Sequence, residues 1–201
     1  MRYITLLDRL LLLLTCLLAA YQVVFGIEGS PSFALLCYTI GFGVLLVAGL
    51  LMIILGFEVL ESPAVVIIST VIPLSLSLGL VAEYLPHLTS PYLIFSIIGL
   101  IVVAITRFNA PQRIAVLSLA IVHGVSGLII TLLPIILSTR GVVKPGFVLV
   151  GVGGALIGLG GLLLYFLKTG SPILSRPTIQ ALFPGLLLLT TLAFVAGFAA
   201  A

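Results

Sequence analysis

The stretch 146-GFVLVGVGGALIGLGG-161 decides the fold of this chain, because it holds seven glycines among residues that are almost all Val, Leu, Ile, Ala or Phe. In water each interior glycine costs a helix about 1 kcal/mol relative to alanine. In lipid the unfolded alternative leaves backbone groups without hydrogen-bond partners, so the same segment holds as a helix. The stretch therefore predicts a membrane-spanning helix that is rich in small residues.

The glycines of this segment fall on two helical faces at about 100° per residue. Those on the first face are Gly151, Gly154, Gly158 and Gly161, and those on the second are Gly146, Gly153 and Gly160. Small residues let neighbouring backbones approach closely. We expect both faces to form helix contacts, with this helix between two neighbours near the middle of a bundle. A phosphate-binding loop is disfavoured because no Lys-Ser/Thr pair follows.

The whole chain has the composition of an integral membrane protein. Of its 201 residues, 62% are hydrophobic and 6% are charged, and the mean hydropathy is +1.49. Soluble domains carry about 25% charged residues. The net charge of +3 comes from few residues and does not form the clustered basic face of a nucleic-acid-binding protein. We expect contact with the lipid bilayer and none with nucleic acid.

Seven segments are candidates to cross a bilayer, which requires about 20 apolar residues. They cover about 5–26, 33–56, 63–83, 91–106, 114–137, 147–167 and 181–200. The sequence predicts an all-α polytopic transmembrane helix bundle, with 1–201 as a single integral membrane domain. Asp8 and Arg9 interrupt the first segment, which also has features of a cleaved signal peptide. Because apolar sequence continues to Phe25, we expect this span to be retained.

The short connections predict a cytoplasmic N-terminus. With seven spans, this orientation places six basic residues inside and two outside, in agreement with the positive-inside rule. The inside residues are Arg2, Arg9, Arg107, Arg113, Lys168 and Arg176, and the outside residues are Arg140 and Lys144. We expect the cytoplasmic membrane of a prokaryote or an equivalent membrane.

The two halves of the chain share a weak internal sequence similarity. Pro31-Ser32-Phe33 before the second span is similar to Pro145-Gly146-Phe147 before the sixth. A duplication would make spans one to three and five to seven parallel repeats joined by span four. This plan is similar to that of SWEET-type transporters in topology only. Chance similarity between apolar segments is the favoured interpretation.

His123 is the one ionisable residue deep inside a predicted span, and such residues commonly mark functional sites. Three roles are open to it: a structural donor to a carbonyl or to Ser126, a carrier of protons or a ligand, and a metal or haem ligand. The structural role is favoured, since a tetrahedral metal site lacks ligands. Gly124-Val125-Ser126-Gly127 matches the GxSG of rhomboid proteases, but their catalytic histidine comes from another helix. We expect no cofactor and no metal.

Glu58 and Glu61 lie three residues apart where the second span ends. Paired carboxylates can bind a cation or relay protons. The favoured alternative is a solvated helix end, where Glu61 lies near the positive N-terminus of the next helix. Glu83 lies near the outer edge of the third span and is likewise interpreted as a solvated residue at a helix end.

The leading functional hypothesis is a noncatalytic integral membrane protein, an accessory subunit or assembly factor of a membrane complex. Its partners would be other membrane subunits or a second copy of the chain. The alternative is a small transporter or channel for a neutral or hydrophobic solute. This alternative is motivated by the internal sequence similarity and by the prolines inside spans, Pro73 and Pro134. An enzyme is the least favoured class.

Overall fold

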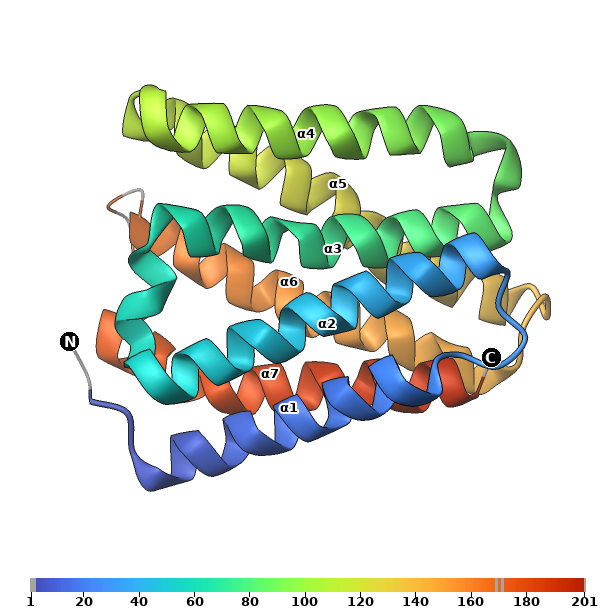
Figure 1. Cartoon of the computed structure of the whole chain (residues 1–201), viewed down its shortest axis with the longest axis horizontal. Helices are drawn as coiled ribbons and strands as arrows, with labels where there is room; N and C mark the ends of the chain where they lie inside the picture. Colours follow the sequence, from blue (N-terminus) through green and yellow to red (C-terminus); the bar gives the residue numbers. More distant parts are fainter. Residues whose placement is uncertain (1–2, 169, 171, 201) are drawn as a thin grey trace.

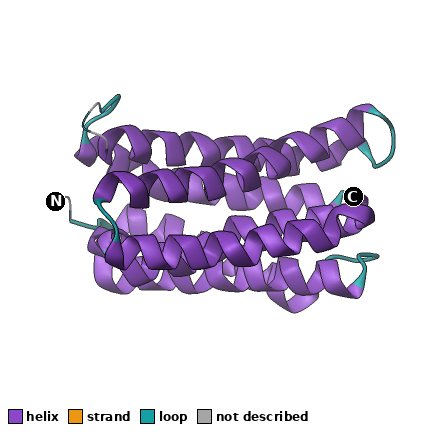
Figure 2. Cartoon of the chain, turned by 90° about the horizontal axis from the view of Figure 1, so that it is seen from above, coloured by secondary structure: helices purple, strands orange, loops and turns teal. Residues whose placement is uncertain are grey.

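The computed structural model of the chain describes residues 3–168, 170 and 172–200, and within these it is all-helical (Figure 2). The described part holds seven helices that are long and apolar enough to cross a membrane. They are α1 (Leu6–Phe25), α2 (Ser32–Leu55), α3 (Pro63–Tyr84), α4 (Thr89–Asn109), α5 (Gln112–Thr139), α6 (Val148–Lys168) and α7 (Arg176–Ala199). Three short 3₁₀ segments lie between them: η1 (Gly56–Glu61), η2 (Pro86–Leu88) and η3 (Pro145–Phe147).

The helix ends lie within three residues of the predicted ones, except at the start of α7. Helix α7 begins at Arg176, five residues before the predicted start at 181. The Ser175 hydroxyl oxygen accepts the Thr178 N–H at 3.3 Å, and a proline fits the first turn. In α1 Asp8 does not interrupt the helix. Its carboxylate accepts the Thr5 N–H at 2.8 Å and so caps the helix.

Six of the helices form a closed ring, in the order α1, α2, α3, α5, α6, α7 and back to α1. Helix α4 lies outside this ring and packs against α3 and α5 (Figure 1). Consecutive helices run in opposite directions. Residues 3–5, η1, the α4–α5 connection, the end of α6 and the start of α7 therefore lie at one end, on the left in Figure 1.

The most enclosed helix is α3, which corrects the expectation that α6 lies near the middle of the bundle. Helix α6 does lie between two neighbours, α5 and α7, but α3 contacts α2, α4 and α5. The buried share of the span is 56% for α3 and 33% for α6. Residues 74–81 of α3 are all buried. This run alternates Leu with Ser and Gly, so large and small side chains both face neighbouring helices.

Aromatic side chains fill the interior of the ring towards the end that carries the α1–α2 and α5–α6 connections. They are Tyr38, Phe42, Phe147, Phe194 and Phe198, and all are buried. The ring centroids of Tyr38 and Phe198 lie 4.8 Å apart, and those of Phe42 and Phe198 lie 6.1 Å apart in an edge-on arrangement. Tilted and edge-on pairs of this kind add to the stabilisation from burial. The helices α2, α7 and the segment η3 are thereby joined through their side chains.

The glycines of α6 divide into those that meet a neighbouring helix and those that do not. A Cβ on Gly151 would lie 2.5 Å from the Thr131 carbonyl oxygen of α5, and a Cβ on Gly154 would lie 3.0 Å from the Thr131 nitrogen. Gly153 and Gly160 lie as closely against Phe194 and Leu186 of α7.

Gly158 and Gly161 do not make the predicted contact. No atom of the described neighbours lies within 4 Å of a Cβ placed at either position. They share a helical face with Gly151 and Gly154, but the close approach of α5 and α6 ends after Gly154. A periodic pattern predicts which residues share a face, whereas the length of the contact depends on the partner helix.

Candidate functional site

His123 contacts the backbone of its own helix. Its Nδ1 lies 3.2 Å from the carbonyl oxygen of Leu119, one turn earlier in α5, and the side chain is half-buried. The expected partner Ser126 instead receives a hydrogen bond from Tyr92 of α4, with 3.3 Å between the two oxygens. The carbonyl beside the His123 ring already belongs to the backbone hydrogen bonds of α5. His123 therefore makes no hydrogen bond with Ser126, the serine of the GxSG match.

Tyr92 connects three helices through hydroxyl groups. Its hydroxyl donates to Ser77 of α3 at 2.8 Å and lies near Ser126 of α5. Ser77 in turn donates to the Pro73 carbonyl oxygen at 2.5 Å. Both serines are fully buried. Buried hydroxyls need such partners where no water is present, so this cluster fixes α4 against the ring beside the proline of α3.

Glu83 at the end of α3 is a hydrogen-bond acceptor for two other elements, which corrects its interpretation as a solvated residue. The Tyr38 hydroxyl of α2 donates to it at 2.8 Å, and the Ser30 hydroxyl donates at 3.2 Å. The Tyr38 ring lies directly against Gly79, one turn before Glu83. A side chain at Gly79 would displace the ring, so this glycine lets the hydroxyl reach the carboxylate.

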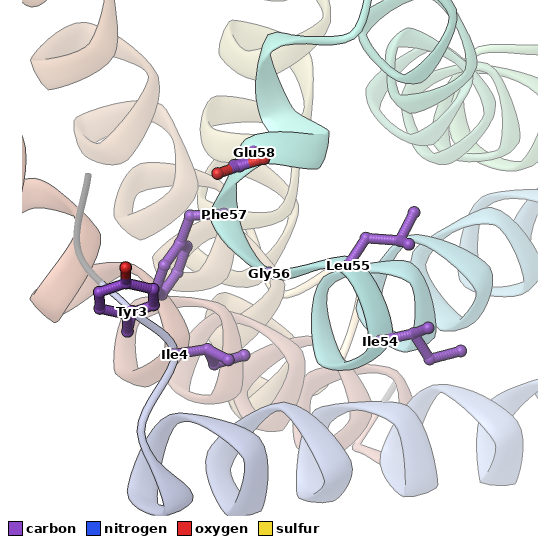
Figure 3. Close-up of a pocket in the computed structure, with 7 residues that line it drawn as sticks. All are labelled: Tyr3, Ile4, Ile54, Leu55, Gly56, Phe57 and Glu58. Carbon is purple, nitrogen blue, oxygen red and sulfur yellow. The ribbon is translucent and has the colours of Figure 1, made fainter.

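Glu58 and Glu61 do not line a common site. Glu58 lines a pocket of about 150 Å³ between the segment before α1 and the junction of α2 with η1. Figure 3 shows Tyr3 and Ile4 on one side of this pocket and Ile54 on the other. Glu61 lines a separate pocket. Within the described residues, no group of three or more His, Cys, Asp or Glu side chains could hold a metal ion.

The second pocket measures about 490 Å³ and lies where α3, α5 and α7 begin and α4 and α6 end. Arg176 donates to the Glu61 carboxylate at 2.5 Å, and both side chains are about half exposed. Arg107 and Gln112 also line this pocket. The pair joins residues 115 positions apart in the sequence, so no local pattern predicts it. This pocket is the candidate functional site of the chain.

Comparisons of the chain with protein-family models, with curated proteins and with solved structures found no match.

Proposed function

We propose that the chain is an integral membrane protein whose seven helices cross the bilayer with the N-terminus in the cytoplasm. The outer surface of α4 and α5 supports this proposal, because large apolar side chains along both helices are more than half exposed. They include Ile94, Ile97, Ile101, Leu117, Ile121 and Leu128. An apolar surface of this extent is unfavourable in water, whereas lipid chains solvate it. The ionisable side chains lie mainly near the two ends.

Cysteine labelling tests this topology. Single cysteines at Asn109 and Val142, in a background where Cys16 and Cys37 are changed to Ala, are treated in intact cells with an impermeant thiol reagent. The proposal expects the cysteine at 142 to label and the one at 109 to be shielded until the cells are opened. Labelling at 109 alone would reverse the orientation. Release of the protein from membranes by alkaline carbonate would refute insertion itself.

We further propose that the protein is a noncatalytic subunit or assembly factor of a membrane complex. The observation that carries this proposal is the aromatic packing inside the ring. Tyr38, Phe42 and Phe198 pack against one another across the interior. The Tyr92 hydroxyl also makes its hydrogen bonds to neighbouring helices. An interior packed in this way leaves the outer surface and the two ends for interaction with partners.

Native mass spectrometry of the protein, purified from its own membrane in a mild detergent, tests this proposal. A stoichiometric partner chain, or a defined oligomer of the chain itself, is the expected result. A monomer that carries a solute across the membrane of sealed vesicles would contradict it and establish the alternative function.

That alternative, a small transporter of three-plus-one-plus-three repeat topology, is supported by the ring. Advancing each helix of the ring by three places maps α1, α2 and α3 onto α5, α6 and α7 and preserves every neighbour relation. In each triplet the middle helix also places glycines in close contact with both flanking helices. In α2, Gly49 lies against Cys16 and Gly41 against Leu76. Uptake of neutral solutes by proteoliposomes tests this candidate, and uptake no faster than in empty vesicles would reject it.

A further inference from the structure

The pocket that contains Arg107 and Arg176 has more positive than negative charge among its described side chains. Glu61 is its one lining carboxylate, and that group is paired with Arg176. The Arg107 side chain makes no hydrogen bond or ion pair with any described residue, although it is half-buried. A guanidinium presents several N–H donors in a planar fork that matches the oxygens of a phosphate or carboxylate. The pocket thus offers an unused anion-binding group.

Two helix N-termini add to this positive potential. Helices α3 and α5 begin at the pocket, where Pro63 and Gln112 line it. Their N-cap residues, Ser62 and Pro111, make no side-chain capping hydrogen bond. The N-terminus of a helix behaves as a partial positive charge and favours anions within the first turn. The arginine and the two helix ends therefore act on the same space.

We propose that this pocket binds a phosphate group, carried either by the headgroup of an anionic phospholipid or by a free phosphorylated molecule. The proposal rests on the proposed membrane insertion, which places the pocket at the cytoplasmic surface, where anionic headgroups are found. Its volume of about 490 Å³ lies within the range of small-ligand sites. The apolar walls formed by Pro63 and Leu167 suit the glycerol and acyl-chain region beside a headgroup phosphate.

Glu61 competes with the ligand in this arrangement. Its carboxylate occupies Arg176, so a phosphate either binds to Arg107 beside the existing pair or displaces Glu61 from Arg176. In both cases the carboxylate repels the incoming anion. Removal of its charge is therefore expected to strengthen binding, whereas removal of the Arg107 charge is expected to weaken it.

The test is native mass spectrometry of the purified full chain in detergent, titrated with phosphatidylglycerol and, for reference, with phosphatidylcholine. Three variants are compared with the unmodified chain: Arg107→Gln, Glu61→Gln and Arg113→Gln. The third is the matched control, because Arg113 is an exposed arginine near the same helix end that does not line the pocket. Circular dichroism confirms that each variant is folded before titration.

Arg107→Gln is expected to weaken phosphatidylglycerol binding roughly fivefold, the factor that corresponds to about 1 kcal/mol for one basic residue near an anionic surface. Arg113→Gln is expected to change it less than about twofold, because that side chain lies outside the pocket. Glu61→Gln is expected to strengthen it. Equal losses in Arg107→Gln and Arg113→Gln would overturn the proposal, since they would indicate general surface attraction. Unchanged binding in Arg107→Gln, or no gain in Glu61→Gln, would also overturn it.

A competition with inorganic phosphate distinguishes the two sources of the phosphate group. Displacement of phosphatidylglycerol at millimolar phosphate assigns the site to a free phosphorylated molecule, and resistance to displacement assigns it to the lipid. Carbonate extraction of the unmodified chain is measured in parallel. A chain that stays in the membrane but shows no dependence on Arg107 refutes the phosphate site and leaves the proposed insertion intact.

Discussion

The contrast between Gly151 and Gly158 gives the most direct test of the packing of α6. The changes are Gly151→Ala and Gly158→Ala, which add the same methyl group two turns apart on one helix. At Gly151 the new Cβ would lie 2.5 Å from the Thr131 carbonyl oxygen, about 0.9 Å short of the 3.4 Å where ordinary van der Waals contact begins. The nearby Ile135 side chain, at 2.7 Å, is also in the way. At Gly158 the methyl group enters open space.

The obstacle at Gly151 is backbone, so relief requires α5 and α6 to separate. Overpacking of this kind costs about 1–3 kcal/mol. The gain in helix propensity, about 1 kcal/mol in water, offsets part of that cost. We expect Gly151→Ala to lower the free energy of unfolding by up to about 2 kcal/mol, and Gly158→Ala to leave it unchanged or raise it by up to about 1 kcal/mol.

The assay is reversible unfolding in mixed micelles with increasing mole fraction of dodecyl sulfate, followed by circular dichroism at a helix band. Both variants are compared with the unmodified chain in one detergent. Equal stability of the two variants would refute the assignment of Gly151 to the α5 contact. A larger loss in Gly158→Ala than in Gly151→Ala would show that the opposite end of α6 carries the contact.

Two further predictions concern polar side chains. Tyr38→Phe removes the hydroxyl that Glu83 accepts at 2.8 Å, so a loss of about 0.6 kcal/mol, and at most about 1.7, is expected in the same unfolding assay. Tyr21→Phe is the control, because that side chain is half exposed, and an equal loss in both variants would contradict the assignment. His123→Gln and His123→Leu are both expected to fold in full yield, because the ring bonds only to a carbonyl of its own helix. A collapsed yield in the Leu variant alone would show that His123 also bonds to another helix, beyond the Leu119 carbonyl that is its one partner among the described residues.

The sequence predicts the helices well because each depends on local properties. A run of about 20 apolar residues is sufficient to identify a span, and Gly and Pro mark most of the ends. The start of α7 was missed because Ser175, Arg176 and Pro177 read as loop residues. In the structure they form a cap and a first turn. Polar residues of this kind occur both in loops and in helix caps. Only the hydrogen bond from the Thr178 N–H to the Ser175 hydroxyl shows that they form a cap here.

Contacts between helices are predicted less well, because they depend on the partner. The pattern of α6 identified Gly151 and Gly153 on separate faces, and these faces meet α5 and α7. The same pattern could not show that the contact ends before Gly158. It also missed Gly79, which is the one glycine of α3, and Gly197 near the end of α7. Gly79 matters because Tyr38 lies over it, and that aromatic partner belongs to another helix.

The candidate site was predicted only in part, because its members come from distant parts of the chain. Sequence reasoning singled out Glu61 but paired it with Glu58, its neighbour three residues away. The structure instead pairs Glu61 with Arg176 and turns Glu58 towards another pocket. The two basic residues Arg107 and Arg176 were counted for orientation alone. A useful signal was available, since the positive-inside rule predicts that charges from several connections gather at one end.

The distribution of polar groups indicates where binding can occur in this molecule. Between the two ends, the Tyr92 hydroxyl is bonded to two neighbouring helices, and a ligand at that hydroxyl would have to break a bond that lipid cannot replace. Towards one end the ring interior is closed by Tyr38 and Phe198. At the other end Arg107 is half-buried and unpaired among the described residues. A ligand that meets this arginine gains a charged hydrogen bond without breaking one, so the pocket around Arg107 is the favourable place for recognition.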